Sequence, residues 1–89
     1  MALIEAVDIE ADEDRYQIGG YQFSSIDRTV TMHALENDDE LEIEPGEVFE
    51  FDGLSQSGRW FISRKDEYGR IQLGWAWVNG GDVFEVTEP

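Results

Sequence analysis

The sequence lacks cysteine altogether and holds only two prolines, one lysine and one histidine. Without cysteine the chain can form neither a disulfide framework nor a zinc–thiolate site. No apolar run approaches the roughly 20 residues that a membrane-spanning helix needs. Residues 1–7 also lack the basic start and apolar core of a signal peptide. These absences predict a cytoplasmic protein that does not cross a membrane.

Basic residues are scarce as well. The chain has 6 lysines and arginines against 21 acidic residues, which gives a net charge of −15. Residues 1–52 contain sixteen acids and two arginines, whereas residues 53–89 contain five acids and four basic residues. Such a field repels nucleic acid and anionic membranes and attracts basic surfaces. We therefore expect a basic protein as the partner, with no direct binding to nucleic acid or membrane.

Enough apolar surface remains for a folded core. A chain of 89 residues fits one small domain, and its 40% of hydrophobic residues make disorder improbable despite the charge. Short β-prone runs separated by turn residues cover the sequence, which predicts an all-β fold of the small-barrel type. The expected strands are 3–9, 16–18, 21–23, 29–35, 40–44, 48–51, 59–65, 70–78 and 83–86.

Two local patterns refine this prediction. Gly19-Gly20 lies between two short β-prone runs and indicates a hairpin, because both central residues of a type I′ turn need positive φ. Residues 24–28 are expected to form a loop. The second pattern lies in the strand expected at 70–78, where apolar residues alternate along one side, and we predict that this side faces the core. That side consists of Ile71, Leu73, Trp75 and Trp77.

Residues 36–52 hold nine carboxylates and no cation. Within them Glu40, Glu42 and Glu44 alternate with Leu41 and Ile43, which predicts a strand with one acidic and one apolar face. Alternate residues of a strand lie about 6.8 Å apart, whereas duplex DNA carries one charge per about 1.7 Å of axis. A single row is therefore sparse, and neighbouring rows would be needed to resemble a phosphate surface. Candidates for them are Asp8, Glu10, Asp12 and residues 36–39.

No other residue in the sequence is assigned a catalytic or metal-binding role. His33 is the single histidine and lies within an expected strand, where a structural role is favoured. Residues 8–13 have Glu where a calcium loop needs Gly, so no metal or cofactor is expected. No serine has a base at a recognisable motif spacing, so no catalytic residue is assigned and no enzymatic activity is expected. The acidity itself has solubility in high salt as an alternative explanation.

Two segments resemble the Src-homology-3 family. DELEIEPGEVFEF and RWFISRKDEYGRIQLGWAWVNGGDVFEV are similar to the second half of that fold, with a DELSF-type strand at 39–43 and a diverging turn at Pro45-Gly46-Glu47. Trp60-Phe61 matches the aromatic pair, and Gly74-Trp75 the glycine before the fourth strand. The resemblance covers about residues 34–86 and implies a small barrel. Residues 1–33 would then add an extra strand and a hairpin.

The resemblance also implies an alternative function, as a module that binds a protein or peptide through Trp60, Trp77 and the acidic loop before Asp39. The chain departs from the family in the groove that binds proline-rich peptides. Glu36-Asn37-Asp38 stands in place of the tyrosines, and Trp77 stands where the groove proline is expected. Because such recognition stacks prolines between aromatic walls, this function is the second choice.

In its size and lopsided acidity, the chain resembles phage-encoded DNA mimics, including anti-CRISPR and anti-restriction proteins. This resemblance implies a non-enzymatic inhibitor that blocks the nucleic-acid site of a basic partner. Glu40, Glu42, Glu44 and Glu47 are expected to carry the interaction, and Asp38 and Asp39 to steer it. The sequence leaves open whether the strands before Thr29 complete the barrel or pair with a second copy in a homodimer.

Overall fold

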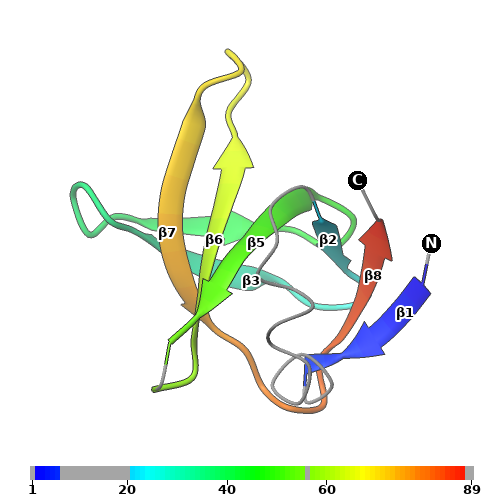
Figure 1. The fold of residues 1–89 in the computed structure, drawn as a ribbon. Coiled ribbons are helices and arrows are strands. Elements are labelled where there is room, and N and C mark those ends of the chain that lie inside the picture. Colours follow the sequence, from blue (N-terminus) through cyan, green and yellow to red (C-terminus); the bar gives the residue numbers. More distant parts are fainter. Residues whose placement is uncertain (1, 7–20, 56, 88–89) are drawn as a thin grey trace.

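The structure is a computed structural model that describes residues 2–6, 21–55 and 57–87. Eight strands form one antiparallel sheet that curls into a half-barrel (Figure 1), which confirms the predicted all-β class. The strands are β1 (Ala2–Glu5), β2 (Gln22–Ser25), β3 (Val30–Ala34), β4 (Glu40–Ile43), β5 (Val48–Leu54), β6 (Arg59–Lys65), β7 (Ile71–Trp77) and β8 (Val83–Thr87).

The strand order is β1-β8-β2-β5-β6-β7-β3-β4, so β1 and β4 are the edges of the sheet. The meander β5-β6-β7 in its centre is compatible with a barrel of the Src-homology-3 type. The strands that precede residue 34 pair within this same sheet: β2 lies between β8 and β5, and β3 lies between β7 and β4. The N-terminal part of the chain therefore contributes interior strands as well as an edge.

The expected loop at 24–28 is wrong at its start. Ser24 and Ser25 belong to β2, and the chain leaves the strand only at Ile26. The reason is tertiary, because β2 has a hydrogen-bonded neighbour on both sides: Ser24 pairs with both β5 and β8, and Ser25 pairs with β8. The predicted hairpin at Gly19-Gly20 and the second half of the strand expected at 3–9 lie outside the described residues.

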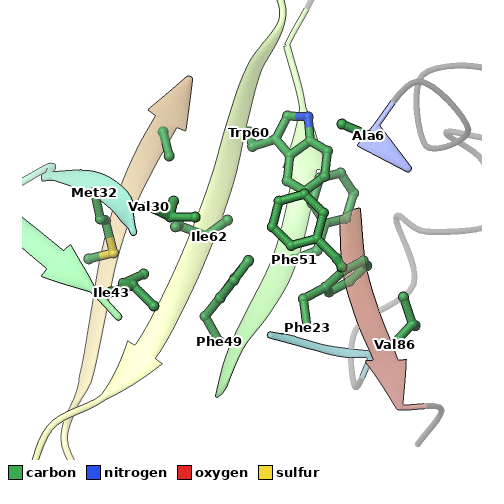
Figure 2. Close-up of a cluster of buried hydrophobic side chains, with 12 residues drawn as sticks. Ala6, Phe23, Val30, Met32, Ile43, Phe49, Phe51, Trp60, Ile62 and Val86 are labelled. Atoms are coloured by element: carbon green, nitrogen blue, oxygen red, sulfur yellow. The ribbon is translucent and has the colours of Figure 1, made fainter. Parts of the chain in front are cut away.

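The core is filled mainly by aromatic side chains from β2, β5, β6 and β8 (Figure 2). Trp60 belongs to this cluster, with ring centroids 5.0 Å from Phe84 and 5.1 Å from Phe51. Phe23 packs between the same rings, 5.6 Å from Phe51. Large rings at alternate strand positions explain why so short a chain can bury a continuous core.

Strand β7 faces the core with its small residues, contrary to the sequence prediction. Gly74 and Ala76 are buried, whereas Ile71, Leu73 and Trp77 are 63%, 53% and 56% exposed. The interior beside β7 is already occupied, since a Cβ atom on Gly74 would lie 2.7 Å from Met32 Cγ. The large side chains of β7 are therefore directed to the outer face of the sheet.

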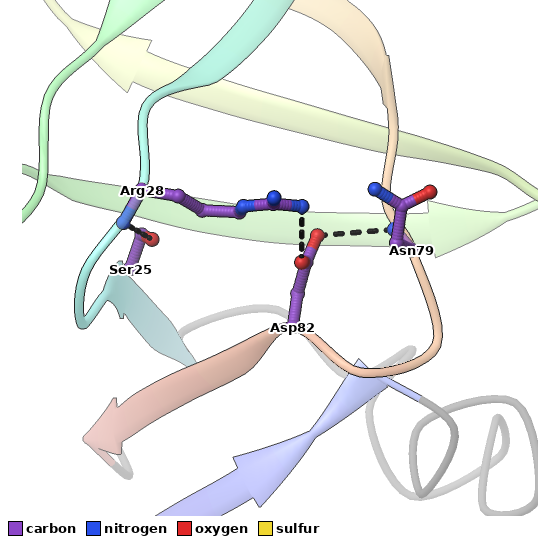
Figure 3. Close-up of polar contacts among 4 residues, drawn as sticks. All are labelled: Ser25, Arg28, Asn79 and Asp82. Atoms are coloured by element: carbon purple, nitrogen blue, oxygen red, sulfur yellow. Dashed lines mark hydrogen bonds and ion pairs between the residues drawn. The ribbon is translucent and has the colours of Figure 1, made fainter.

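A polar cluster joins the loop after β2 to the turn before β8 (Figure 3). Arg28 donates a hydrogen bond of 2.7 Å from Nη1 to Asp82 Oδ1, and the backbone N–H of Asn79 donates to Asp82 Oδ2. Ser25 Oγ accepts the backbone N–H of Arg28 at 3.3 Å. These contacts fix the loop that leads into β3, and β3 in turn positions the acidic strand β4.

Candidate partner-binding surface

Strand β4 presents the predicted row of carboxylates. Ile43 is fully buried and Leu41 is partly buried, whereas Glu40, Glu42 and Glu44 are exposed. On β3, Thr31 faces Glu42 and donates a hydrogen bond of 3.3 Å to its Oε1. The side chains of the row thus lie on the outer face of the sheet, held by a strand whose opposite face is anchored in the core.

Two side chains, Arg64 of β6 and Glu47 of the turn after β4, form hydrogen bonds with the free backbone edge of β4. The register of β3 and β4, with Ala34 N–H bonded to Asp39 O, directs the backbone groups of Glu40 and Glu42 away from β3. Arg64 Nη1 donates to Glu42 O at 3.1 Å, and Glu47 Oε1 accepts the N–H of Glu44 at 3.0 Å. Side-chain caps of this kind restrict edge-to-edge pairing with another strand.

The tight turn between β3 and β4 carries Asp38 and Asp39, both exposed. Asp38 has a φ of 59°, a conformation that Asp and Asn tolerate better than most residues. Asn37 Oδ1 accepts the N–H of Asp39 at 3.2 Å. These two exposed carboxylates therefore precede the row of β4 in the chain. The further rows expected from Asp8, Glu10 and Asp12 lie outside the described residues.

The two tryptophans proposed for partner binding lie in different environments. Trp60 is 1% exposed and belongs to the core, so its ring has no free face for a ligand. Trp77 is 56% exposed at the end of β7. Trp77 and the acidic residues are thus exposed, whereas Trp60 faces the core.

A ladder of stacked side chains crosses the outer face and was not anticipated from the sequence. The Arg59 guanidinium carbon lies 4.7 Å from the ring centroid of Trp75 and 5.6 Å from that of Trp77. Trp75 stacks on His33 with centroids 4.2 Å apart, and His33 Nδ1 is 3.9 Å from Glu40 Oε1. The ladder thus connects β6, β7, β3 and β4 in spatial order. Its sequence signal is the alternation of large residues with Gly74 and Ala76 along β7.

One carboxylate of β5, Asp52, has a raised pKa. Burial of the carboxyl group raises the pKa of Asp52. A hydrogen bond of 3.4 Å from Ser63 Oγ opposes this shift, and the nearby charge of Glu50 adds to it. A raised pKa means that the folded state holds the proton more tightly than the unfolded chain does. The contribution to stability is complete below the unfolded pKa and is lost as the pH rises through the folded pKa.

Asp52→Asn should therefore stabilise the fold at pH 7 and have no effect at about pH 3, where the carboxyl group is protonated in both states. The gain should be small, below about 0.5 kcal/mol, because the residue as a whole is exposed. Urea unfolding of both proteins at the two pH values measures it. Asp27→Asn, an exposed loop carboxylate, is the control. A variant less stable than the parent at pH 7 would contradict the assignment.

A candidate metal site is not found among the described residues. In the ranges 2–6, 21–55 and 57–87, no three His, Cys, Asp or Glu side chains come together as ligands for a metal ion. The calcium-like segment 8–13 lies outside these ranges. Within the same part of the chain, no helix has the length and apolar character needed to cross a bilayer.

The chain matches no protein-family model, no curated protein and no solved structure.

Proposed function

We propose that this chain is a non-enzymatic binding protein whose acidic strand β4 occupies the nucleic-acid site of a basic partner, in the manner of a DNA-mimic inhibitor of the anti-CRISPR or anti-restriction type. One observation carries the proposal: Glu40 and Glu42 project from the exposed face of β4, and exposed Glu44 follows directly after it, while Ile43 anchors the opposite face in the core. Fixed carboxylates need no reordering on binding, so their summed attraction for lysines and arginines is retained.

The mechanism is electrostatic. Alternate residues of β4 place one carboxylate about every 6.8 Å, and Glu47, Asp38 and Asp39 extend the charge at the two ends of the row. Basic side chains that normally hold phosphates would contact these carboxylates instead. Binding should therefore weaken as salt rises and should compete with DNA.

Neutralising the row tests this proposal. If each exposed contact contributes about 0.5 kcal/mol, the triple variant Glu40→Gln, Glu42→Gln, Glu44→Gln should weaken binding about tenfold and flatten its salt dependence. The measurement is recovery of a nucleic-acid-handling protein from lysate by the immobilised chain, at low and high salt and with competing DNA.

A variant of equal net charge separates a local site from general acidity. The variant Asp27→Asn, Glu67→Gln, Glu85→Gln also removes three negative charges, but from residues outside β4. This control should bind as the parent does. Equal losses in the two triple variants would reject the β4 site and leave only non-specific attraction or a role of the acidity in solubility.

A second candidate function is supported by the exposed ring of Trp77. An interaction module would use this ring for a protein or peptide ligand, and it would then depend on Trp77 and not on Glu42. Binding that the triple neutralisation leaves unchanged even at low salt, and that is lost in Trp77→Ala, would favour the module over the mimic.

A further inference from the structure

The outer face of β7 carries an apolar stripe, and the strands on its two sides differ in charge. The stripe consists of Ile71, Leu73, Trp75 and Trp77. It runs about 20 Å along the strand, from the rise of about 3.4 Å per residue. Ile71, Leu73 and Trp77 are exposed, whereas Trp75 is partly covered by Arg59 and His33. Exposed apolar patches of this kind mark contacts with a partner.

The two sides of the stripe differ in charge. Cations line the adjacent strand β6, with Glu50 of β5 one strand further, whereas on the other side two glutamates lie on β4 beyond β3. On the β6 side, Arg59 is paired in register with Trp77, and Lys65 with Ile71. On the other side, β3 separates the stripe from β4, where Glu40 and Glu42 stand on the same outer face. With neighbouring strands about 4.8 Å apart, the carboxylates lie about 10 Å from the stripe. One partner surface can therefore cover both.

The ladder makes this a continuous contact surface. Trp75, His33 and Glu40 follow one another across β7, β3 and β4, with the stacking and ion-pair distances given above. Beside Trp77 a recess of about 250 Å³ opens toward β3, lined by Thr31 and His33 among others. A side chain from a partner can enter this recess and lie against the exposed ring.

We propose that the apolar stripe of β7 and the carboxylates of β4 form a single docking surface for a protein segment that carries arginine beside a large apolar side chain. This inference rests on the proposed function and specifies its partner. Charge complementarity orients the segment: its arginines lie over Glu40 and Glu42, because Arg59 and Lys65 repel them from the opposite edge. Its apolar side chains cover Trp77 and Leu73, which supply a contact that salt does not screen.

The test uses two synthetic peptides of equal charge, acetyl-(Arg-Leu)₃-amide and acetyl-(Arg-Ser)₃-amide, titrated into the isotope-labelled chain. The indole N–H signals of Trp75 and Trp77 should shift with the leucine peptide, while that of buried Trp60 stays in place as an internal reference. The serine peptide should bind at least tenfold more weakly. An oligothymidylate of similar length should leave all three signals unchanged.

Variants assign the two parts of the surface. Trp77→Ala and, independently, Leu73→Ser should each weaken the leucine peptide several-fold at all salt concentrations, with thermal unfolding close to that of the parent. Glu40→Gln with Glu42→Gln should weaken it only at low salt.

The outcomes separate this inference from the proposed function. Equal binding of the two peptides, no binding of either, or an unchanged affinity in both Trp77→Ala and Leu73→Ser would overturn the combined surface. Shifts of the Trp77 signal by the oligothymidylate would overturn it in favour of a nucleic-acid platform. The β4 mimic itself stands or falls separately, on the triple glutamate variant and its equal-charge control.

Discussion

Trp60→Ala should largely unfold the protein at temperatures where the parent is folded. The side chain is 1% exposed and contacts the rings of Phe23, Phe51 and Phe84. Truncating a buried tryptophan costs about 3–5 kcal/mol, a large share of the about 5–15 kcal/mol that keeps a small domain folded. Tm should fall by roughly 12 °C or more. Thermal unfolding followed by circular dichroism measures the change.

Trp77→Ala is the matched control, because it makes the same chemical change on the outer face. It should alter stability little, since its ring is 56% exposed. Comparison of the two variants also separates folding from binding. A loss of binding in Trp60→Ala would result from unfolding, whereas a loss in Trp77→Ala would report a contact with the partner. A folded Trp60→Ala protein with a Tm close to that of the parent would refute the placement of this ring in the core.

Gly74→Ala should destabilise the protein by about 1–3 kcal/mol, the usual cost of overpacking a core. The added Cβ atom would lie 2.7 Å from the backbone oxygen of His33 and 2.7 Å from Met32 Cγ. Met32 can move its side chain, but the carbonyl of His33 can move only if β3 shifts away from β7. Because β3 carries β4, the acidic row should loosen as well, and amide hydrogen exchange should quicken at Leu41 and Ile43.

Gly53→Ala provides the comparison within another strand. A Cβ atom there has no atom within 4 Å, and its φ is not positive. This substitution should therefore be neutral or slightly stabilising. Equal stability of the two alanine variants, or unchanged exchange in β4 of Gly74→Ala, would show that β3 and β7 approach less closely than the structure has them.

The candidate site could be predicted only where one face of a strand differs clearly from the other. In β4 and the residue after it, glutamates alternate with Leu41 and Ile43. Successive side chains of a strand point to opposite faces, so burial of the apolar residues implies exposure of Glu40, Glu42 and Glu44. On β7 the same period identifies the side that carries Trp75 and Trp77. It does not say which side faces inward, because the other side, with Gly74 and Ala76, is also apolar.

Trp60 illustrates the same limit from another direction. A resemblance to a peptide-binding family implies a ligand groove for it, whereas a large apolar ring within a strand favours a core. The decision depends on what lies opposite, namely Phe23, Phe51 and Phe84, which come from three other strands. Contacts so distant in sequence leave no local pattern.

The sequence by itself determined the charge distribution, the β-rich character and the acidic face of β4, because composition and the alternation of side chains along a strand are local properties. Only the tertiary structure decided that β4 is an edge strand, that β2 lies between β8 and β5, and that β7 directs its large residues outward. Strand order and the limited volume inside a small barrel decide these features, and both depend on residues that meet only once the whole sheet has formed.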